Sequence, residues 1–129
     1  MVNVLVADGK LDERLALQLM LKDMNMHVIG EAGDWESLLS QVVATLPDLI
    51  LLDYGLLLSE SICDMQQLRE LCSDETMIIL ISDFGAREQA ALSTGVDLFI
   101  SKNERFDNLA QRLRTAAESI HLKRLHTAN

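Results

Sequence analysis

The sequence is poor in residues that interrupt regular structure or cross-link small folds. It has one proline, six glycines and two cysteines among 129 residues. So little proline and glycine disfavours collagen-like, linker-like and loop-rich all-β chains, and two cysteines are too few for a disulfide scaffold and suit a reducing compartment. No apolar run approaches the ~18 residues needed to cross a bilayer, and the N-terminal segment lacks the basic region of a signal peptide. We therefore expect a cytoplasmic protein without a membrane segment.

Basic side chains are also scarce, since 11 lysines and arginines stand against 20 acidic residues and leave a formal net charge of -9. This charge repels phosphate backbones, so no nucleic-acid binding is expected through this chain. The composition is 49% hydrophobic and 24% charged, which is ordinary for a globular domain with a buried core. Because domains commonly have about 100–150 residues, we expect residues 1–129 to form one domain.

Short β-like runs alternate with amphipathic helical stretches along the chain. The expected strands are 2–7, 27–32, 48–53, 76–81 and 96–100, and the expected helices are 11–24, 35–46, 60–72, 86–94 and a last one after Asn103. Five repeats of strand and helix with right-handed crossovers predict an α/β fold. We expect a single doubly wound sheet of parallel strands with helices on both faces, in the order 2-1-3-4-5 that is common for such sheets.

Local patterns define the ends and faces of these elements. Asp34 is the expected N-cap of the second helix and Pro47 ends it, while Gly95 and Asn103 are expected to cap the fourth and fifth helices. Four consecutive aliphatic residues before Asp53 indicate a strand buried on both faces. Helical spacing assigns the apolar side of the first helix to Leu15, Leu19, Met20 and Met24. The same spacing assigns that of the second helix to Trp35, Leu38, Leu39, Val42, Val43 and Leu46.

Polar side chains stand at the carboxyl ends of four predicted strands: Asp8, Asp53, Ser82 and Lys102. In open α/β sheets, ligands bind at this edge, where the strand order reverses, and the order 2-1-3-4-5 places Asp8 beside Asp53. Two carboxylates with open water positions suit Mg²⁺, while a hydroxyl and an ammonium can contact phosphoryl oxygens. Any one of these residues alone is more often a turn former, a cap or a solvated charge. Together, the four indicate a site.

Four segments carry a family pattern: Val-Leu-Val-Ala-Asp8, Pro47-Asp-Leu-Ile-Leu-Leu-Asp53, Ile-Leu-Ile-Ser82 and Gly95-Val-Asp-Leu-Phe99-Ile-Ser-Lys102. With them, the chain resembles the response-regulator receiver domain, the phosphoacceptor module of two-component signalling, over essentially its whole length. It is most similar to receivers that carry helix-turn-helix output domains. The resemblance implies a flavodoxin-like (βα)5 fold and a signalling switch that is not an enzyme.

The resemblance also implies roles for individual residues and for partners. Asp53 would accept a phosphoryl group from a histidine kinase or a phosphotransfer protein. Asp8, Asp53 and the backbone carbonyl of Gly55 would hold Mg²⁺. The implied switch and phosphoryl contacts are Ser82, Phe99 and Lys102. Further implied partners are an output domain or partner protein and, in a homodimer, a second copy of the chain.

One acid of the family's metal-binding pair is missing, because Gly9 and then Lys10 follow Asp8. We therefore expect weak Mg²⁺ binding, and the alternative function is a pseudo-receiver, a protein-interaction module that works without phosphate on Asp53. A third interpretation, a small-molecule enzyme or flavin-binding domain on the same fold, is disfavoured because no phosphate-binding loop follows the first strand. Without Mg²⁺, we expect the ammonium of Lys10 or Lys102 to pair with Asp53 and relieve carboxylate repulsion.

Overall fold

The computed structural model of the chain describes residues 2–57, 62–82, 96–101 and 106–127. Its strands are β1 (Asn3–Ala7), β2 (His27–Ala32), β3 (Leu49–Asp53), β4 (Met77–Ser82) and β5 (Leu98–Ser101). Its helices are α1 (Leu11–Asp23), α2 (Trp35–Thr45), α3 (Tyr54–Leu57), α4 (Ile62–Leu71) and α6 (Phe106–Thr127). Neighbouring strands pair in parallel in the order β2-β1-β3-β4-β5. The predicted doubly wound sheet and its strand order are confirmed.

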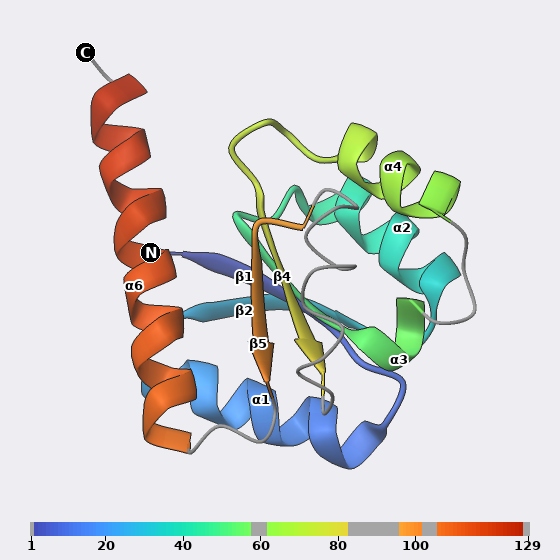
Figure 1. Cartoon of the computed structure of the whole chain (residues 1–129), viewed down its shortest axis with the longest axis horizontal. Helices are drawn as coiled ribbons and strands as arrows, with labels where there is room; N and C mark the ends of the chain where they lie inside the picture. The colour runs from blue at the N-terminus through green and yellow to red at the C-terminus, as the bar shows by residue number, and fades with distance from the viewer. Residues whose placement is uncertain (1, 58–61, 83–95, 102–105, 128–129) are drawn as a thin grey trace.

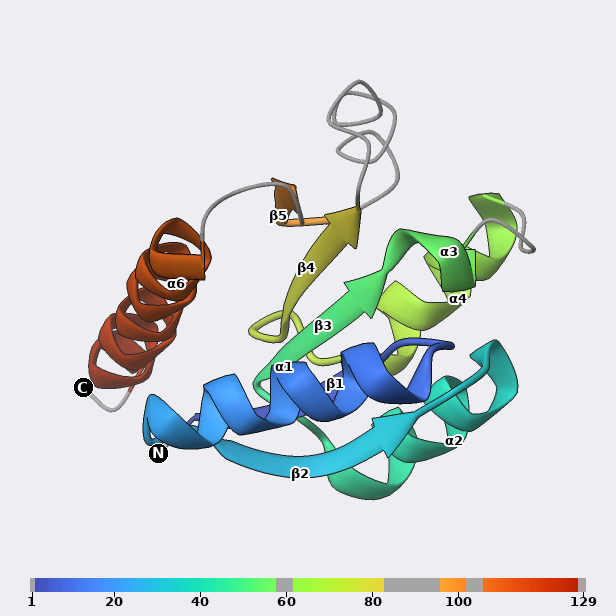
Figure 2. The same ribbon diagram turned by 90° about the horizontal axis from the view of Figure 1, so that it is seen from below.

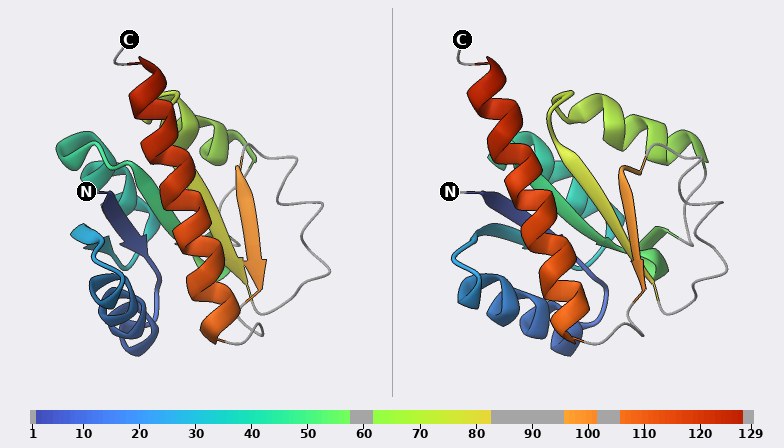
Figure 3. Two further views of the ribbon diagram at one scale, coloured as in Figure 1. Left: turned by 90° about the vertical axis from the view of Figure 1, so that its left-hand side faces the viewer. Right: turned by 60° about the vertical axis from the view of Figure 1, so that its left-hand side comes forward.

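Helices cover both faces of the sheet (Figure 1, Figure 2). The sheet therefore divides the hydrophobic core into two layers. On one face, α1 and α6 bury Leu21 and Leu113, and on the other face α2 and α4 bury Leu38 and Leu68. Figure 3 shows α6 crossing one face, with α2 and α4 behind the sheet. The neighbouring strands β1 and β3 end at Ala7 and Asp53, so their carboxyl ends lie together at one edge of the sheet.

The central strand, β3, is buried on both faces. Leu49 and Leu51 belong to the layer with α1 and α6, whereas Ile50 and Leu52 belong to the layer with α2 and α4. Successive side chains of a strand point to opposite faces, so an unbroken aliphatic run fills both layers at once. The prediction of a doubly buried strand is confirmed, and Asp53 ends this strand at the open edge of the sheet.

The predicted apolar face of α1 is wrong in part. Leu15 and Leu19 are 48% and 66% exposed, and the side that packs on the sheet consists of Leu17, Met20, Leu21 and Met24. Two apolar stripes run along this helix, because residues four apart share a side. Only one stripe can face the sheet, and the Arg14 side chain, on the same side as Leu17 and Leu21, contacts the end of β1 and favours that choice.

Helix α2 begins and ends close to where the sequence predicts. The Asp34 carboxylate accepts a hydrogen bond of 2.7 Å from the Ser37 N–H, and Leu46 takes a left-handed conformation with φ of 47° just before Pro47. Trp35, Leu38 and Val42 are the buried side chains of the predicted apolar series. Val43 and Leu46 are exposed, because the sheet and α4 cover only one side of α2.

Some other predicted features differ from the structure, and some lie in residues outside the described ranges. The helix α3 was not predicted, and it begins directly after Asp53. The predicted helix 86–94, its cap Gly95 and the predicted cap Asn103 lie outside the described residues. Within the part of the chain that is described, no helix combines the length and the apolar character needed to cross a membrane.

The Asp34 cap makes the stability of the folded chain depend on pH. The hydrogen bond from the Ser37 backbone lowers the pKa of Asp34 below its usual value of 3.8. Because the pKa of Asp34 is lower in the folded chain than in the unfolded chain, its ionised carboxylate stabilises the fold. This stabilisation is complete above the pKa of the unfolded chain and is lost as the pH falls through the pKa of the folded chain. An asparagine caps helices nearly as well but does not titrate. Urea titrations at about pH 5 and about pH 3 should therefore show a smaller loss of unfolding free energy in Asp34→Asn than in the parent chain. An equal loss would contradict this account.

Candidate carboxylate site at the sheet edge

The carboxyl ends of β1 and β3 bring two acidic side chains together. The strands are neighbours, with Ala7 opposite Leu52, so Asp8 after β1 lies beside Asp53 at the end of β3. Asp8 is fully buried and Asp53 is half-buried. The structure thus brings together the two acids that the sequence places at this edge.

A third carboxylate, which the sequence analysis missed, joins them. Glu13 belongs to the first turn of α1, and one carboxylate oxygen from each of Asp8, Glu13 and Asp53 lies within 4.8 Å of the others. The sequence does hold a signal for it, because α1 begins at Leu11, only three residues after Asp8. An acid in that turn stays close to the strand end. The family pattern directs attention to position 9 instead.

Polar contacts hold the start of α1 against the end of β1. Asp8 Oδ1 accepts a hydrogen bond of 2.9 Å from the Lys10 N–H, and the Asp8 carbonyl accepts one of 2.7 Å from Arg14 Nη1. Arg14 Nε also lies 3.5 Å from Glu31 Oε1, so one guanidinium ties α1 to both β1 and β2. These contacts fix the first turn of α1, to which Glu13 belongs, against the end of β1.

The turn from β3 into α3 orients the Asp53 carboxylate. Asp53 Oδ2 accepts a hydrogen bond of 3.0 Å from the Gly55 N–H. A Cβ atom at Gly55 would lie 2.7 Å from the same oxygen, which is closer than real Cβ atoms approach, so a larger residue would displace the carboxylate. The role of the Gly55 carbonyl as a metal ligand stays a prediction.

Electrostatic repulsion within the cluster calls for a cation. Two like charges about 4 Å apart repel by roughly 1 kcal/mol in bulk water and about 4 kcal/mol at the effective dielectric of a protein surface. The exposed Lys10 ammonium lies 3.7 Å from Glu13 Oε1, so it neutralises part of this charge. Lys10 thus forms its ion pair with Glu13. The pairing of the Lys10 or Lys102 ammonium with Asp53 stays a prediction.

The other predicted site residues come from β4, β5 and the segment that follows. Ser82 ends β4 next to Ile81, the partner of Asp53 in the sheet register, and is 2% exposed. Phe99 of β5 is buried and packs in the layer with α2 and α4. Lys102 lies outside the described residues. The structure therefore places Ser82 at the carboxylate edge and Phe99 in the core.

The donor set of the cluster fits a hard divalent cation. All three side chains offer carboxylate oxygens, the ligand type that Mg²⁺ prefers, and this ion usually keeps several waters in its coordination shell. Glu13 and Asp53 are half-buried and Asp8 is buried, so the cluster is anchored in the fold but stays open to water. These residues are compatible with a hydrated Mg²⁺.

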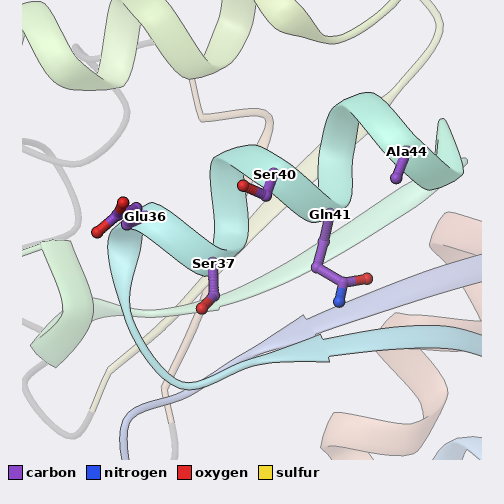
Figure 4. Close-up of a pocket in the computed structure, with 5 residues that line it drawn as sticks. All are labelled: Glu36, Ser37, Ser40, Gln41 and Ala44. Atoms are coloured by element: carbon purple, nitrogen blue, oxygen red, sulfur yellow. The ribbon is translucent and has the colours of Figure 1, made fainter.

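A separate hollow lies on α2 and does not belong to this site (Figure 4). It is lined by Glu36, Ser37, Ser40, Gln41 and Ala44. None of the three clustered carboxylates contributes to it, and Glu36 is its one charged residue. Nothing in its lining supports phosphoryl or metal chemistry.

Comparison with known proteins gives one consistent family. A family model described as the response regulator receiver domain matches residues 4–114. The signal receiver domain of NarL from Mycobacterium tuberculosis is 27% identical, with a TM-score of 0.77 over 91% of this chain and 96% of that chain. NtrX from Brucella abortus, in a crystal structure with ATP, is 26% identical, with a TM-score of 0.80 over 98% of this chain and 29% of its own.

A third solved structure agrees in fold. The REC domain of AraT, a response regulator from Geobacillus stearothermophilus, is 23% identical, with a TM-score of 0.75 over 99% of this chain and 98% of that chain. At that identity, the likeness concerns the fold alone. The search among curated proteins found no match.

Proposed function

Because this chain belongs to the family of response regulator receiver domains, we propose that it receives a phosphoryl group on Asp53 and thereby switches an output in two-component signalling. The observation that supports the acceptor role is the place of the Asp53 carboxylate. It ends the central strand, is only half-buried, and lies within 4.8 Å of the carboxylates of Asp8 and Glu13. An acceptor at this edge is open to a donor protein and is still held by the fold.

The donor in this proposal is a phosphohistidine of a histidine kinase or of a phosphotransfer protein. A carboxylate oxygen of Asp53 attacks phosphorus, so that a P–O bond forms while the P–N bond breaks. The imidazole leaves with the bonding electron pair and takes up a proton. The product is an acyl phosphate, which carries about one more negative charge than the carboxylate did.

This added charge needs compensation, because Asp8 and Glu13 already crowd Asp53. In the proposal, Asp8, Asp53 and the Gly55 carbonyl would hold a hydrated Mg²⁺, which would supply positive charge to balance the phosphoryl group. The Gly55 N–H donates to the Asp53 carboxylate and keeps it oriented toward the donor.

The switch in this proposal couples the phosphoryl group to β4 and β5. Ser82, at the end of β4, donates a hydrogen bond to a phosphoryl oxygen, and Lys102 supplies an ammonium. Phe99 changes position with them, and the exposed surface of the domain changes in turn. A phosphoryl group can shift such an equilibrium only by contacts that differ between the two states, and Ser82 and Lys102 would make those contacts.

The second candidate function is the pseudo-receiver, and Gly9 is the observation that favours it. In this alternative, the fold serves as a protein-interaction module without phosphate on Asp53. In both functions the chain acts as a signalling module and not as an enzyme. Phosphorylation of the chain would exclude the alternative.

The partners and setting follow from the same proposal. We propose that residues 1–129 form the receiver domain and that it works in the cytoplasm. Its partners are a histidine kinase or phosphotransfer protein, an output domain or partner protein, and a second copy of the chain. The net charge of -9 disfavours binding of nucleic acids by this chain, because it repels their phosphate backbones.

Phosphorylation by a small phosphodonor tests the proposal directly. We expect the intact mass of the chain to rise by one phosphoryl group with phosphoramidate in the presence of Mg²⁺, and the modification to be lost at alkaline pH as an acyl phosphate hydrolyses. Chelation of Mg²⁺ should slow the uptake strongly. If no mass change occurs at saturating Mg²⁺ in a folded sample, the pseudo-receiver function is the correct one.

A further inference from the structure

The carboxylate that the family pattern lacks at position 9 has a counterpart elsewhere in the structure. We propose that Glu13 replaces it as the third acid of the divalent cation site, so that the site is rebuilt from the first turn of α1. This inference rests on the proposed function in that the cation is the one the receiver family uses. It assigns a ligand that the family pattern does not include.

Proximity is the first argument. Gly9 carries no side chain, whereas an oxygen of Glu13 lies within 4.8 Å of oxygens of both Asp8 and Asp53. Three carboxylate oxygens at such spacing can share one hydrated cation, through direct contacts or through its waters. The cluster therefore holds as many acids as the family pattern provides. The third acid, Glu13, lies on α1 and not directly after Asp8.

The fixed position of α1 is the second argument. Arg14 Nη1 donates a 2.7 Å hydrogen bond to the Asp8 carbonyl, and its Nε lies 3.5 Å from Glu31 Oε1. Glu13 is the preceding residue in the same helical turn. A tether of this kind fixes the first turn of α1 near the strand ends, so less backbone freedom is lost when Glu13 binds a cation.

The structure also makes another role for Glu13 less necessary. A glutamate at the third helical position commonly caps the N–H of the N-cap residue. Here the N-cap is Lys10, and its N–H donates to Asp8 Oδ1 at 2.9 Å. Asp8 therefore provides this cap, and the Glu13 carboxylate lies beside the carboxylates of Asp8 and Asp53. The Lys10 ammonium, 3.7 Å from Glu13 Oε1 and mostly exposed, is placed to give way to a divalent cation.

Metal titration with matched variants tests the proposal. Mg²⁺ is titrated calorimetrically into the full chain, and Mn²⁺ binding is followed by electron paramagnetic resonance, with no phosphodonor present. We expect Glu13→Gln to weaken the affinity by about tenfold or more, since removing a group that supports a metal site commonly has that effect. The control is Asp12→Asn, which removes the same charge from the adjacent exposed residue and should change the affinity by less than about twofold.

A rescue variant separates lost ligation from a damaged fold. A Cβ atom at Gly9 would lie 3.6 Å from the Gly33 carbonyl oxygen and 3.9 Å from Leu56 Cδ1, both ordinary contacts, so Gly9→Asp should fold. In the Glu13→Gln background, Gly9→Asp should restore Mg²⁺ affinity by placing the acid where the family has it. Equal losses in Glu13→Gln and Asp12→Asn, or no Mg²⁺ binding by the parent chain, would overturn the proposal.

Failure of this inference is distinguishable from failure of the proposed function. If Asp53 takes up phosphate and Mg²⁺ affinity is independent of Glu13, the proposed function stands and the role of Glu13 is wrong. If Mg²⁺ binding depends on Glu13 and the folded chain takes up no phosphate, the cation site is confirmed and the phosphoacceptor function is wrong.

Discussion

The Asp53→Asn variant is expected to take up no phosphoryl group under conditions that phosphorylate the parent chain. The amide is neutral and far less nucleophilic than the carboxylate, so no acyl phosphate forms. The replacement has nearly the same shape, and its carbonyl oxygen can still accept the hydrogen bond that the Gly55 N–H gives to Asp53. Intact-mass measurement after incubation with phosphoramidate and Mg²⁺ gives the result.

The matched control for this variant is Asp48→Asn, at the residue directly before the same strand. Asp48 Oδ2 accepts a hydrogen bond of 2.8 Å from the Asn3 N–H, and an amide oxygen can replace it. Asp48→Asn removes one negative charge, as Asp53→Asn does, and should retain phosphate uptake. Full uptake by Asp53→Asn would show that another residue is the acceptor.

The Leu80→Ala variant is expected to lose about 2–5 kcal/mol of unfolding free energy. Leu80 is fully buried in β4, where its register partners are Leu52 and Phe99. Truncation removes apolar contacts on the face covered by α2 and α4 and leaves a cavity that close-packed neighbours fill only partly. Urea denaturation followed by circular dichroism measures the loss.

An exposed leucine of α1 provides the comparison. Leu19 is 66% exposed, so Leu19→Ala should change the unfolding free energy by no more than about 0.5 kcal/mol. Alanine also has the higher helix propensity. A loss in Leu19→Ala as large as in Leu80→Ala would mean that the exposed stripe of α1 is buried in solution by a second molecule.

Much of the fold could be predicted because the relevant signals are local. The aliphatic run before Asp53 predicted a doubly buried strand, and the Asp34 and Pro47 signals predicted the ends of α2. Each depends on periodicity or turn chemistry within a few residues. The prediction that Asp8 and Asp53 meet needed one further step, the flavodoxin-like strand order 2-1-3-4-5, which makes β1 and β3 neighbours.

Two features depended on long-range contacts. The sequence of α1 contains two apolar stripes, and local spacing alone gave no reason to prefer the one with Leu17 and Leu21 over the one with Leu15 and Leu19. The rotation of a helix about its axis is decided by packing against elements that are distant in the sequence. In this chain the sheet and the Arg14 contact with Asp8 provide that packing.

By itself, the sequence determined the class of fold and the edge at which acids gather, because these follow from periodicity and from the residues after each strand, while the strand order came from the resemblance to a flavodoxin-like family. Only the tertiary structure decided that the third acid of the cluster is Glu13. The start of α1 three residues after Asp8 keeps Glu13 near the end of β1, but its approach to Asp53, 40 residues further along the chain, depends on how α1 packs on the sheet. Residues that far apart in the chain meet only through the packing of a helix on a sheet, which no local pattern specifies.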